Sequence, residues 1–267
     1  MEPVLIDAEE LAQRLASDEP PTVLDVRWQL GGPDGHEEYL KGHIPGAVFV
    51  DMEGELSRHG EPTDGRHPLP SVEDFQNAAR RWGVRADRGV VVYDATGGLA
   101  AARAWWLLRW AGVNEVRLLD GGLPSWSGEL ATDEVQPEPS EIVLTGGGMP
   151  TVELDDVQSS AGLLLDARAG ERYRGETEPI DPKAGHIPGA VSAPTTENLG
   201  ADGRFRHPDE LRERFERLGA TGDVVVYCGS GVTAAHEIAA LAIAGIHAAL
   251  YPGSWSQWSN HDLPVET

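Results

Sequence analysis

The sequence predicts an α/β protein of two tandem domains, each a parallel β-sheet flanked by helices. Short continuous apolar runs alternate with helical patterns along the chain, as is typical of buried parallel strands joined by crossover helices. The same motifs also occur twice in the same order, and 267 residues are enough for two domains that each bury a core. Together these observations indicate a duplicated domain.

The duplication is visible in four pairs of segments, separated by 132 to 143 positions: 24–27 with 165–168, 42–48 with 185–191, 91–94 with 225–228, and 121–126 with 253–258. In the second pair both copies carry the letters Gly-His-Ile-Pro-Gly-Ala-Val. Because the order is kept and the spacing changes only between motifs, insertions in loops account for the differences. We therefore expect both copies to fold alike.

The apolar runs predict strands in the first copy at 23–26, 47–50, 90–93 and 116–119, and helices at 8–17, 72–82 and 99–111. In the second copy they predict strands at 163–167, 190–193, 224–227 and 248–251, and helices at 153–161, 208–218 and 232–244. Residues 132–150 hold Pro137, Pro139 and three consecutive glycines, a linker composition. The expected domains are thus 1–131 and 151–267, joined by that linker.

Composition excludes several function classes. The first ten residues lack a basic region followed by an apolar stretch, and no apolar run approaches the roughly 20 residues that span a bilayer, so we expect a soluble, cytoplasmic protein. A single cysteine fits a reducing compartment and excludes an intramolecular disulfide. A net charge of -23 disfavours nucleic acid and anionic membranes as partners. No zinc, nucleotide or flavin motif is visible, so we expect neither metal nor cofactor. No long amphipathic stripe outside the predicted helices indicates an obligate partner, so we expect a monomer or weak homo-oligomer.

The single cysteine, Cys228, ends the apolar run 224–227 and opens a glycine-rich turn into a predicted helix. The backbone N–H groups of such a turn and the positive end of a helix dipole stabilise a thiolate. Functional groups of parallel sheets also gather at the carboxyl ends of strands, where Cys228 falls. These features predict that Cys228 is a nucleophile and that Gly229, Gly231, Val232 and Thr233 form its anion cradle.

In the first copy Asp94 aligns with Cys228. No second aspartate two residues later and no metal motif accompanies Asp94, so an aspartyl nucleophile is disfavoured. We expect Asp94 to make a polar contact where the thiol stands in the other copy. The first copy is therefore expected to be non-catalytic and the second catalytic.

These residues resemble the rhodanese family of sulfurtransferases in its tandem form, which implies two rhodanese-like domains. The resemblance rests on the repeated Gly-His-Ile-Pro-Gly-Ala motif, on Asp120-Gly121-Gly122, and on the Cys228 loop, and it covers nearly the whole chain. It implies that the cysteine accepts a sulfane sulfur from a small anionic donor, becomes a persulfide and passes the sulfur to a thiol, a thioredoxin-like protein or cyanide. The chemistry agrees, since a thiolate attacks divalent sulfur readily.

The loop letters Cys-Gly-Ser-Gly-Val-Thr are similar to those of 3-mercaptopyruvate sulfurtransferases rather than to the cationic loops of thiosulfate sulfurtransferases. The resemblance implies that Arg172 holds the anionic end of the donor and that Ser230, His67 and Glu53 form a proton relay. Cleavage of 3-mercaptopyruvate leaves an enolate that needs a proton, which a hydroxyl such as Ser230 helps to supply. However, Asp181 stands where the relatives have a second substrate arginine, and Lys183 is the nearest cation.

Three alternatives remain beside a 3-mercaptopyruvate sulfurtransferase. Thiosulfate could be the donor, with the same nucleophile. A non-catalytic sulfur carrier or binding module would need only the intact thiol. A phosphatase of the Cys-x5-Arg type is disfavoured, because the position that should hold its arginine is Ala234.

Overall fold

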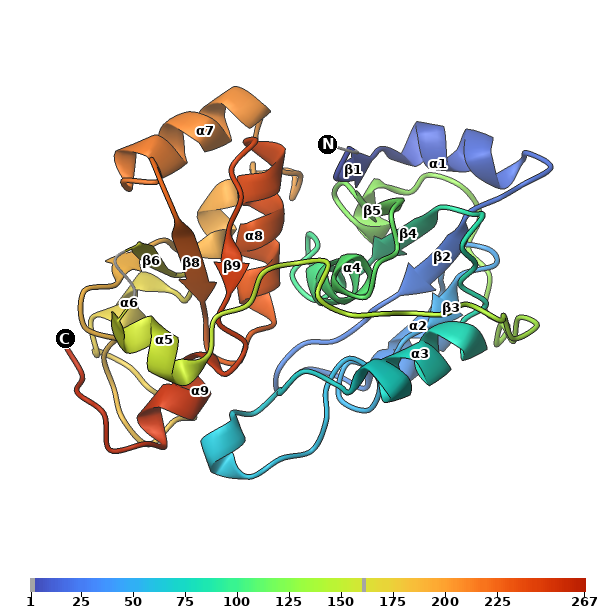
Figure 1. Cartoon of the computed structure of the whole chain (residues 1–267). Coiled ribbons are helices and arrows are strands. Elements are labelled where there is room, and N and C mark those ends of the chain that lie inside the picture. The colour runs from blue at the N-terminus through green and yellow to red at the C-terminus, as the bar shows by residue number, and fades with distance from the viewer. Residues whose placement is uncertain (1–2, 160–161) are drawn as a thin grey trace. The chain divides into compact units, whose positions relative to one another are not determined.

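The computed structural model describes residues 3–159 and 162–267 (Figure 1). The chain divides into two compact units. The first takes in residues up to Ser57, Pro70–Met149 and Ala201–Arg204. The second takes in Arg58–Leu69, Pro150–Gly200 and Phe205–Thr267. The second unit thus includes a short segment, Arg58–Leu69, from the first half of the chain.

The first unit is built on a five-stranded sheet in the order β1-β5-β4-β2-β3, in which neighbouring strands pair in parallel. Its strands are β1 (Leu5–Ile6), β2 (Thr22–Asp25), β3 (Val48–Phe49), β4 (Val90–Tyr93) and β5 (Val116–Leu119). Its helices are α1 (Ala8–Leu15), α2 (Gly35–Lys41), α3 (Val72–Arg81), α4 (Ala101–Trp110) and the 3-10 turn η2 (Leu123–Ser125). Helix α4, green in Figure 1, packs against β4 and β5.

The second unit repeats this plan on a four-stranded parallel sheet in the order β7-β6-β8-β9. Its strands are β6 (Leu163–Asp166), β7 (Val191–Ser192), β8 (Val224–Tyr227) and β9 (Ala249–Leu250). Its helices are α5 (Leu154–Ser159), α6 (Gly170–Tyr173), α7 (Pro208–Arg217), α8 (Thr233–Ile243) and α9 (Ser254–Ser259), with 3-10 turns η1 (Pro62–Asp64) and η3 (Thr195–Asn198). Helix α8 packs against β8 and β9 (Figure 1). The α/β class and the two parallel sheets confirm the expectation from the sequence.

Local chemistry explains where these elements begin and end. Both β4 and β8 read Val-Val-Val-Tyr and are buried along their whole length, as β-branched residues in a doubly covered parallel sheet should be. Helix α3 begins after Ser71, whose hydroxyl accepts the Asp74 N–H at 3.0 Å. Helices α4 and α8 are rich in alanine and buried on nearly all sides, which suits helices enclosed by the core rather than lying on its surface.

The repeated motifs form the same buried ion pair in both units. Arg168 Nη2 lies 2.6 Å from an Asp166 oxygen and donates to the Gly185 carbonyl at 2.7 Å. In the first unit Arg27 pairs with Asp25 at 2.6 Å and donates to the Gly42 carbonyl at 3.0 Å. Each pair joins the end of a central strand to the Gly-His turn, and charge-assisted bonds of this kind hold that turn in register.

The repeated histidines support the same turn. His43 Nδ1 lies 3.0 Å from the Tyr39 carbonyl and its ring stacks on Tyr39 at 3.9 Å. His186 Nδ1 lies 2.8 Å from the Tyr173 carbonyl and its ring stacks on Tyr173 at 3.8 Å. Both histidines are buried, so their role in the two units is structural.

Several short elements were not predicted from the sequence: β1, α2, α6, α9 and the 3-10 turns. The strands expected at 47–50, 190–193 and 248–251 contain only two paired residues each. The helix expected at 153–161 is α5, and residues 160–161 lie outside the described part of the chain. Residues 132–150 form neither helix nor strand, in line with a linker composition.

Candidate active site

Cys228 lies directly after β8 and five residues before Thr233, where α8 begins. Its side chain is buried, and the Gly231 N–H donates to Sγ at 3.1 Å. The thiol thus lies close to the N-terminus of the 11-residue helix α8, a position that favours negative charge. The structure therefore places the thiol where the sequence predicted it. The cradling roles of the Gly229, Val232 and Thr233 amides stay predictions.

The backbone of the Cys228 loop is bound by the start of α9. Ser254 Oγ accepts the Cys228 N–H at 3.1 Å, and the Trp255 N–H donates to the Cys228 carbonyl at 3.0 Å. The Ser256 N–H donates to the Gly229 carbonyl at 2.9 Å. Ser254 has a φ of 55°, a left-handed conformation that costs a non-glycine residue about 1–2 kcal/mol. Beyond the repeated Gly-x-x-x-x-Trp segment, no pattern in the sequence indicates this support.

Ser230 and His67 form a hydrogen-bonded pair beside the thiol. Ser230 Oγ lies 2.7 Å from His67 Nδ1, and the two side chains are 7% and 4% exposed. His67 belongs to the Arg58–Leu69 segment, which the second unit holds through the bond from the Arg66 N–H to Ser256 Oγ at 3.0 Å. The structure thus brings together two members of the expected relay. Glu53 belongs to the first unit, where Trp28 Nε1 donates to it at 3.0 Å, and its part in the relay stays a prediction.

Two arginines and two carboxylates lie next to the Cys228 loop, and we call Arg66, Arg172, Glu178 and Asp181 the anchor cluster. Arg172, from α6, donates through Nη2 to both Glu178 oxygens at 2.7 and 2.9 Å, and the same nitrogen lies 3.3 Å from Asp181 Oδ2. Arg66 Nη1 donates to Asp181 Oδ1. The carboxylate side chains are 4% and 3% exposed. The cluster is therefore a partly buried network of paired charges.

The anchor cluster faces the sulfur loop at Gly229. A Cβ atom placed on Gly229 would lie 3.1 Å from Arg66 Nη2 and 3.4 Å from Arg172 Nη1. These two nitrogens are on the sides of the guanidinium groups that Asp181 does not occupy. A glycine at this position thus lets two cations approach the loop that carries the thiol. The two guanidinium groups thus present N–H donors to the loop while their charges are paired with Glu178 and Asp181.

Arg66 is the functional candidate that sequence reasoning missed. Its position directly before His67 was the available signal, but its approach to Gly229 depends on how the Arg58–Leu69 segment packs in the second unit. Lys183, the nearest cation in the sequence, instead donates to the backbone carbonyls of His261 and Leu263 at 2.7 and 3.3 Å. Lys183 is therefore used to fix the C-terminal segment.

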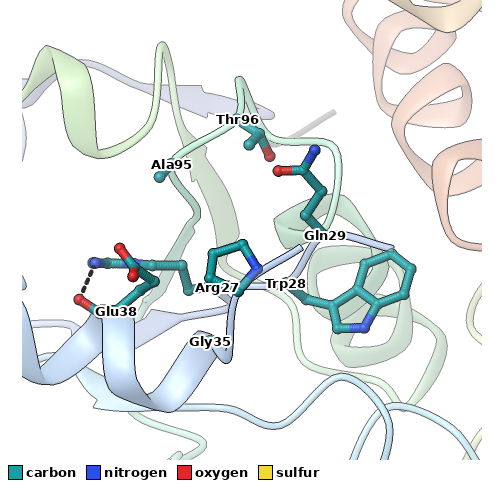
Figure 2. A pocket seen from close by; sticks show the side chains of 8 residues that line it. Arg27, Trp28, Gln29, Gly35, Glu38, Ala95 and Thr96 are labelled. Atoms are coloured by element: carbon teal, nitrogen blue, oxygen red, sulfur yellow. Dashed lines mark hydrogen bonds between the residues drawn. The ribbon is translucent and has the colours of Figure 1, made fainter. Parts of the chain in front are cut away.

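Asp94 occupies the matching loop of the first unit. Its Oδ1 accepts the Thr96 and Gly98 N–H groups at 2.7 and 2.9 Å, and its Oδ2 accepts those of Ala100 and Ala101 at 2.8 and 3.0 Å. This confirms the expected polar contact. A hollow beside this loop is lined by Ala95 and Thr96 on one side and by residues 27–29 on the other (Figure 2). The Arg27 side chain in it donates to the Glu38 carbonyl at 2.6 Å, so its charge is already engaged.

The described residues contain neither a metal-binding cluster nor a membrane-spanning helix. No group of three or more histidine, cysteine, aspartate and glutamate side chains there could hold a metal ion. None of the helices in residues 3–159 and 162–267 is long and apolar enough to cross a membrane.

Comparison with known proteins agrees with this geometry. A family model described as "Rhodanese-like domain" matches residues 7–129 and 151–261. A protein of Mycobacterium tuberculosis named "Putative thiosulfate sulfurtransferase SseB" is 47% identical, over 96% of this chain and 94% of that protein. The 3-mercaptopyruvate sulfurtransferase of Escherichia coli is 38% identical, over 98% of this chain and 97% of that protein.

Among solved structures, that of SseA from Escherichia coli, a 3-mercaptopyruvate sulfurtransferase, superposes with a TM-score of 0.85. It is 35% identical and covers 94% of this chain and 98% of its own. Two domain matches and near full-length relatives of this similarity show the family. The chain belongs to the rhodanese family and is a sulfurtransferase.

Proposed function

We propose that this enzyme moves a sulfane sulfur from 3-mercaptopyruvate to a thiol or cyanide acceptor through a persulfide on Cys228. The observation that carries the proposal is the Ser230–His67 pair, at 2.7 Å, two residues beyond a thiol that accepts the Gly231 N–H. This arrangement combines a stabilised sulfur nucleophile with a route for a proton. The relatives named as 3-mercaptopyruvate sulfurtransferases support the choice of donor.

In the first half-reaction the Cys228 thiolate attacks the sulfur atom of 3-mercaptopyruvate. A sulfur–sulfur bond forms, the carbon–sulfur bond of the donor breaks, and its electron pair remains on the carbon as the enolate of pyruvate. The enolate takes a proton and leaves as pyruvate. In the second half-reaction an acceptor thiolate or cyanide attacks the outer persulfide sulfur, which regenerates the Cys228 thiolate.

Ser230 and His67 suit the proton transfer of the first half-reaction. A histidine that holds a serine hydroxyl can deliver a proton through it, or polarise a donor carbonyl with it. The two groups are 163 positions apart in the chain, so only the fold brings them together. Glu53 would complete the relay by orienting the histidine ring.

The guanidinium groups of Arg66 and Arg172 suit the carboxylate of the donor. Their nitrogens next to Gly229 can each donate to a carboxylate oxygen, and a planar guanidinium matches that geometry. The amides of Gly229, Gly231, Val232 and Thr233 would surround the sulfur that is transferred. The donor would therefore lie with its anionic end on the arginines and its sulfur over the loop.

Thiosulfate is the second candidate donor, because the Mycobacterium tuberculosis relative carries a thiosulfate sulfurtransferase name. With thiosulfate the sulfur–sulfur bond of the donor breaks and sulfite leaves with the electron pair, so no proton is needed. The same Cys228 serves both donors. A carrier that takes up sulfur once without turnover is the alternative from a different class.

We further propose that domain 1–131 is non-catalytic, that 132–150 links it to the catalytic domain 151–267, and that the protein acts as a monomer or weak homo-oligomer. Asp94 supports the first point, because it leaves no thiol in the first loop. A cytoplasmic setting suits the chemistry, since a reducing compartment keeps a single cysteine free.

Steady-state and stoichiometric assays together test the proposed function. With excess 3-mercaptopyruvate and a thiol acceptor we expect many turnovers per chain, with pyruvate and acceptor persulfide formed in equal amounts. Without acceptor, mass spectrometry should find one added sulfur atom, on the peptide that holds Cys228. One added sulfur without turnover in the presence of acceptor would indicate a carrier, and faster turnover with thiosulfate would make thiosulfate the donor.

A further inference from the structure

Asp181 lies between the two arginines that face the sulfur loop. One of its oxygens accepts from Arg66 and the other lies 3.3 Å from Arg172 Nη2. Its backbone N–H donates to Glu178 Oε1 at 3.1 Å, which fixes the loop that carries it. Burial raises the pKa of Asp181 above its usual value and the Glu178 charge adds to the rise, while the charges of Arg66 and Arg172 oppose it. The carboxylate is thus held in place as the shared counter-ion of both guanidinium groups.

The charges of the anchor cluster balance. Arg66 and Arg172 contribute two positive charges, and Glu178 and Asp181 contribute two negative ones. Arg168 also lies 3.5 Å from Glu178, but its closest carboxylate is Asp166 at 2.6 Å. Every negative charge that a donor brings to this cluster is therefore uncompensated. Placing an uncompensated charge in a partly buried site costs more free energy than leaving it in water, and this cost grows with the charge of the donor.

We propose that Asp181 sets the charge preference of the donor site: by offsetting one of the two arginines, it favours a donor whose bound end carries a single negative charge over a dianion. The inference rests on the proposed function and specifies the donor class. Asp181 acts through the arginines and is a specificity-determining residue that need not contact the sulfur. The monoanionic end corresponds to an α-keto carboxylate, and the disfavoured dianion to thiosulfate.

A change of donor preference separates this role from a purely structural one. Removal of one negative charge improves the electrostatic energy of a dianion by about twice as much as that of a monoanion, because the energy is proportional to the donor charge. Loosening of the arginines would instead weaken both donors alike. The ratio of kcat/KM for thiosulfate to kcat/KM for 3-mercaptopyruvate therefore reports the charge of Asp181 and cancels most of the effect of loosening.

The test is Asp181→Asn, assayed with both donors and one acceptor. We expect the ratio to rise about tenfold, a typical size for one partly buried charge at close range. Asp181→Glu, which keeps the charge, should leave the ratio near that of the wild type. Asp209→Asn removes a charge from a 77% exposed side chain of the same unit and should change nothing. An equal fall for both donors in Asp181→Asn would overturn the inference.

A second measurement needs no turnover, and its first comparison uses the wild type alone. Iodoacetamide, which is neutral, labels the Cys228 thiol, and bound anions should slow that labelling. In the wild type at matched ionic strength, pyruvate should protect Cys228 at a lower concentration than sulfate, and Asp181→Asn should shift this order toward sulfate. Better protection of the wild type by sulfate than by pyruvate would contradict the inference, even if the variant does not fold.

The two measurements also separate the inference from the proposed function. If neither donor forms a persulfide, the proposed function fails, while the protection of Cys228 by pyruvate and sulfate still decides the role of Asp181. If sulfur transfer occurs and Asp181→Asn leaves the ratio of the two kcat/KM values unchanged, only the inference fails.

Discussion

The two strand-to-helix loops, one in each unit, follow identical strands but begin with different side chains, Asp94 in the first unit and Cys228 in the second. Both follow a Val-Val-Val-Tyr strand, but the first spans residues 94–100 before α4 and the second spans residues 228–232 before α8. The first encloses the carboxylate of Asp94 with four N–H groups, and in the second the Gly231 N–H donates to the Cys228 sulfur. The comparison teaches that the same strand-to-helix loop directs backbone N–H groups at a carboxylate in one unit and at a sulfur atom in the other. Only the second loop carries a thiol, the group that we propose as the nucleophile.

The segments that support the two loops also correspond. Gly122 in the first unit has a φ of 59°, and Ser254, 132 positions later, has a φ of 55°. A Cβ on Gly122 would lie 2.5 Å from the Asp94 carbonyl oxygen, so glycine is required there. In the second unit the serine side chain is accommodated, and its hydroxyl accepts the Cys228 N–H. The second copy therefore tolerates backbone strain for a contact that the first copy lacks.

The largest expected effect is that of Cys228→Ser, which removes the thiol from the loop that carries it. Transfer from both donors should fall to background, because a serine oxygen cannot become a persulfide. The circular dichroism spectrum and the melting temperature should stay close to those of the wild type, since serine is nearly isosteric. Retained turnover would show that the nucleophile lies elsewhere.

Asp94→Ala should mainly affect stability. Four N–H groups that Asp94 now satisfies would lose their acceptor, and we expect a loss of about 3 kcal/mol in the free energy of unfolding of the first unit. Denaturant unfolding measures this loss, with Asp87→Ala, whose side chain is 74% exposed, as the control. At a temperature where the variant is folded, iodoacetamide should still label Cys228 at the wild-type rate. An unchanged unfolding midpoint would mean that the first loop does not depend on its carboxylate.

Ser230→Ala tests the proton route that we propose for the second loop. We expect kcat with 3-mercaptopyruvate to fall roughly a hundredfold, as for loss of a general acid, and kcat with thiosulfate to change much less. The reason is that the enolate of pyruvate needs a proton and sulfite does not. Thiosulfate thus serves as the internal control within one protein. Equal losses with both donors would assign Ser230 to binding or to loop structure.

The smallest effect is expected from a pair of changes at Ser254. Ser254→Gly removes about 1 kcal/mol of left-handed strain but also two hydrogen bonds of the hydroxyl, from the Cys228 N–H and to the Tyr251 carbonyl, so we expect a net loss of about 1 kcal/mol in stability. Ser254→Ala loses the same two bonds but keeps the strain, and should be less stable than Ser254→Gly by about 1 kcal/mol. In both variants the Cys228 amide should exchange its hydrogen faster. Equal stability of the two variants would show that φ at this position carries no strain.

Much of the fold could be predicted from the sequence, because buried parallel strands are continuous apolar runs and the repeat fixed their correspondence. The four-residue strands β4, β5 and β8 were located to within a residue. The two-residue strand β1 and the short helices α6 and α9 were missed, since elements of this length have too few residues to show a period. Their formation depends on hydrogen bonds to neighbours that the sequence does not reveal.

The candidate site, like the fold, could be predicted only in part. Cys228 and its partners along the loop follow from local sequence, and the Ser230–His67 pair followed from the family resemblance. The grouping of Arg66 with Asp181 could not be predicted, because these residues are 115 positions apart and meet only in the folded second unit. No repeating pattern in a single sequence indicates which distant charged residues form an ion pair.

The hydrogen bonds from the start of α9 have a mechanical consequence for sulfur loading. The Cys228 N–H, the Cys228 carbonyl and the Gly229 carbonyl are all committed to residues 254–256. Their peptide planes therefore cannot rotate to make room when the side chain lengthens by one sulfur atom. The loop backbone is held fixed on the side that faces residues 254–256. We therefore expect the added sulfur atom to extend toward Arg66 and Arg172, where an incoming acceptor would have to reach it.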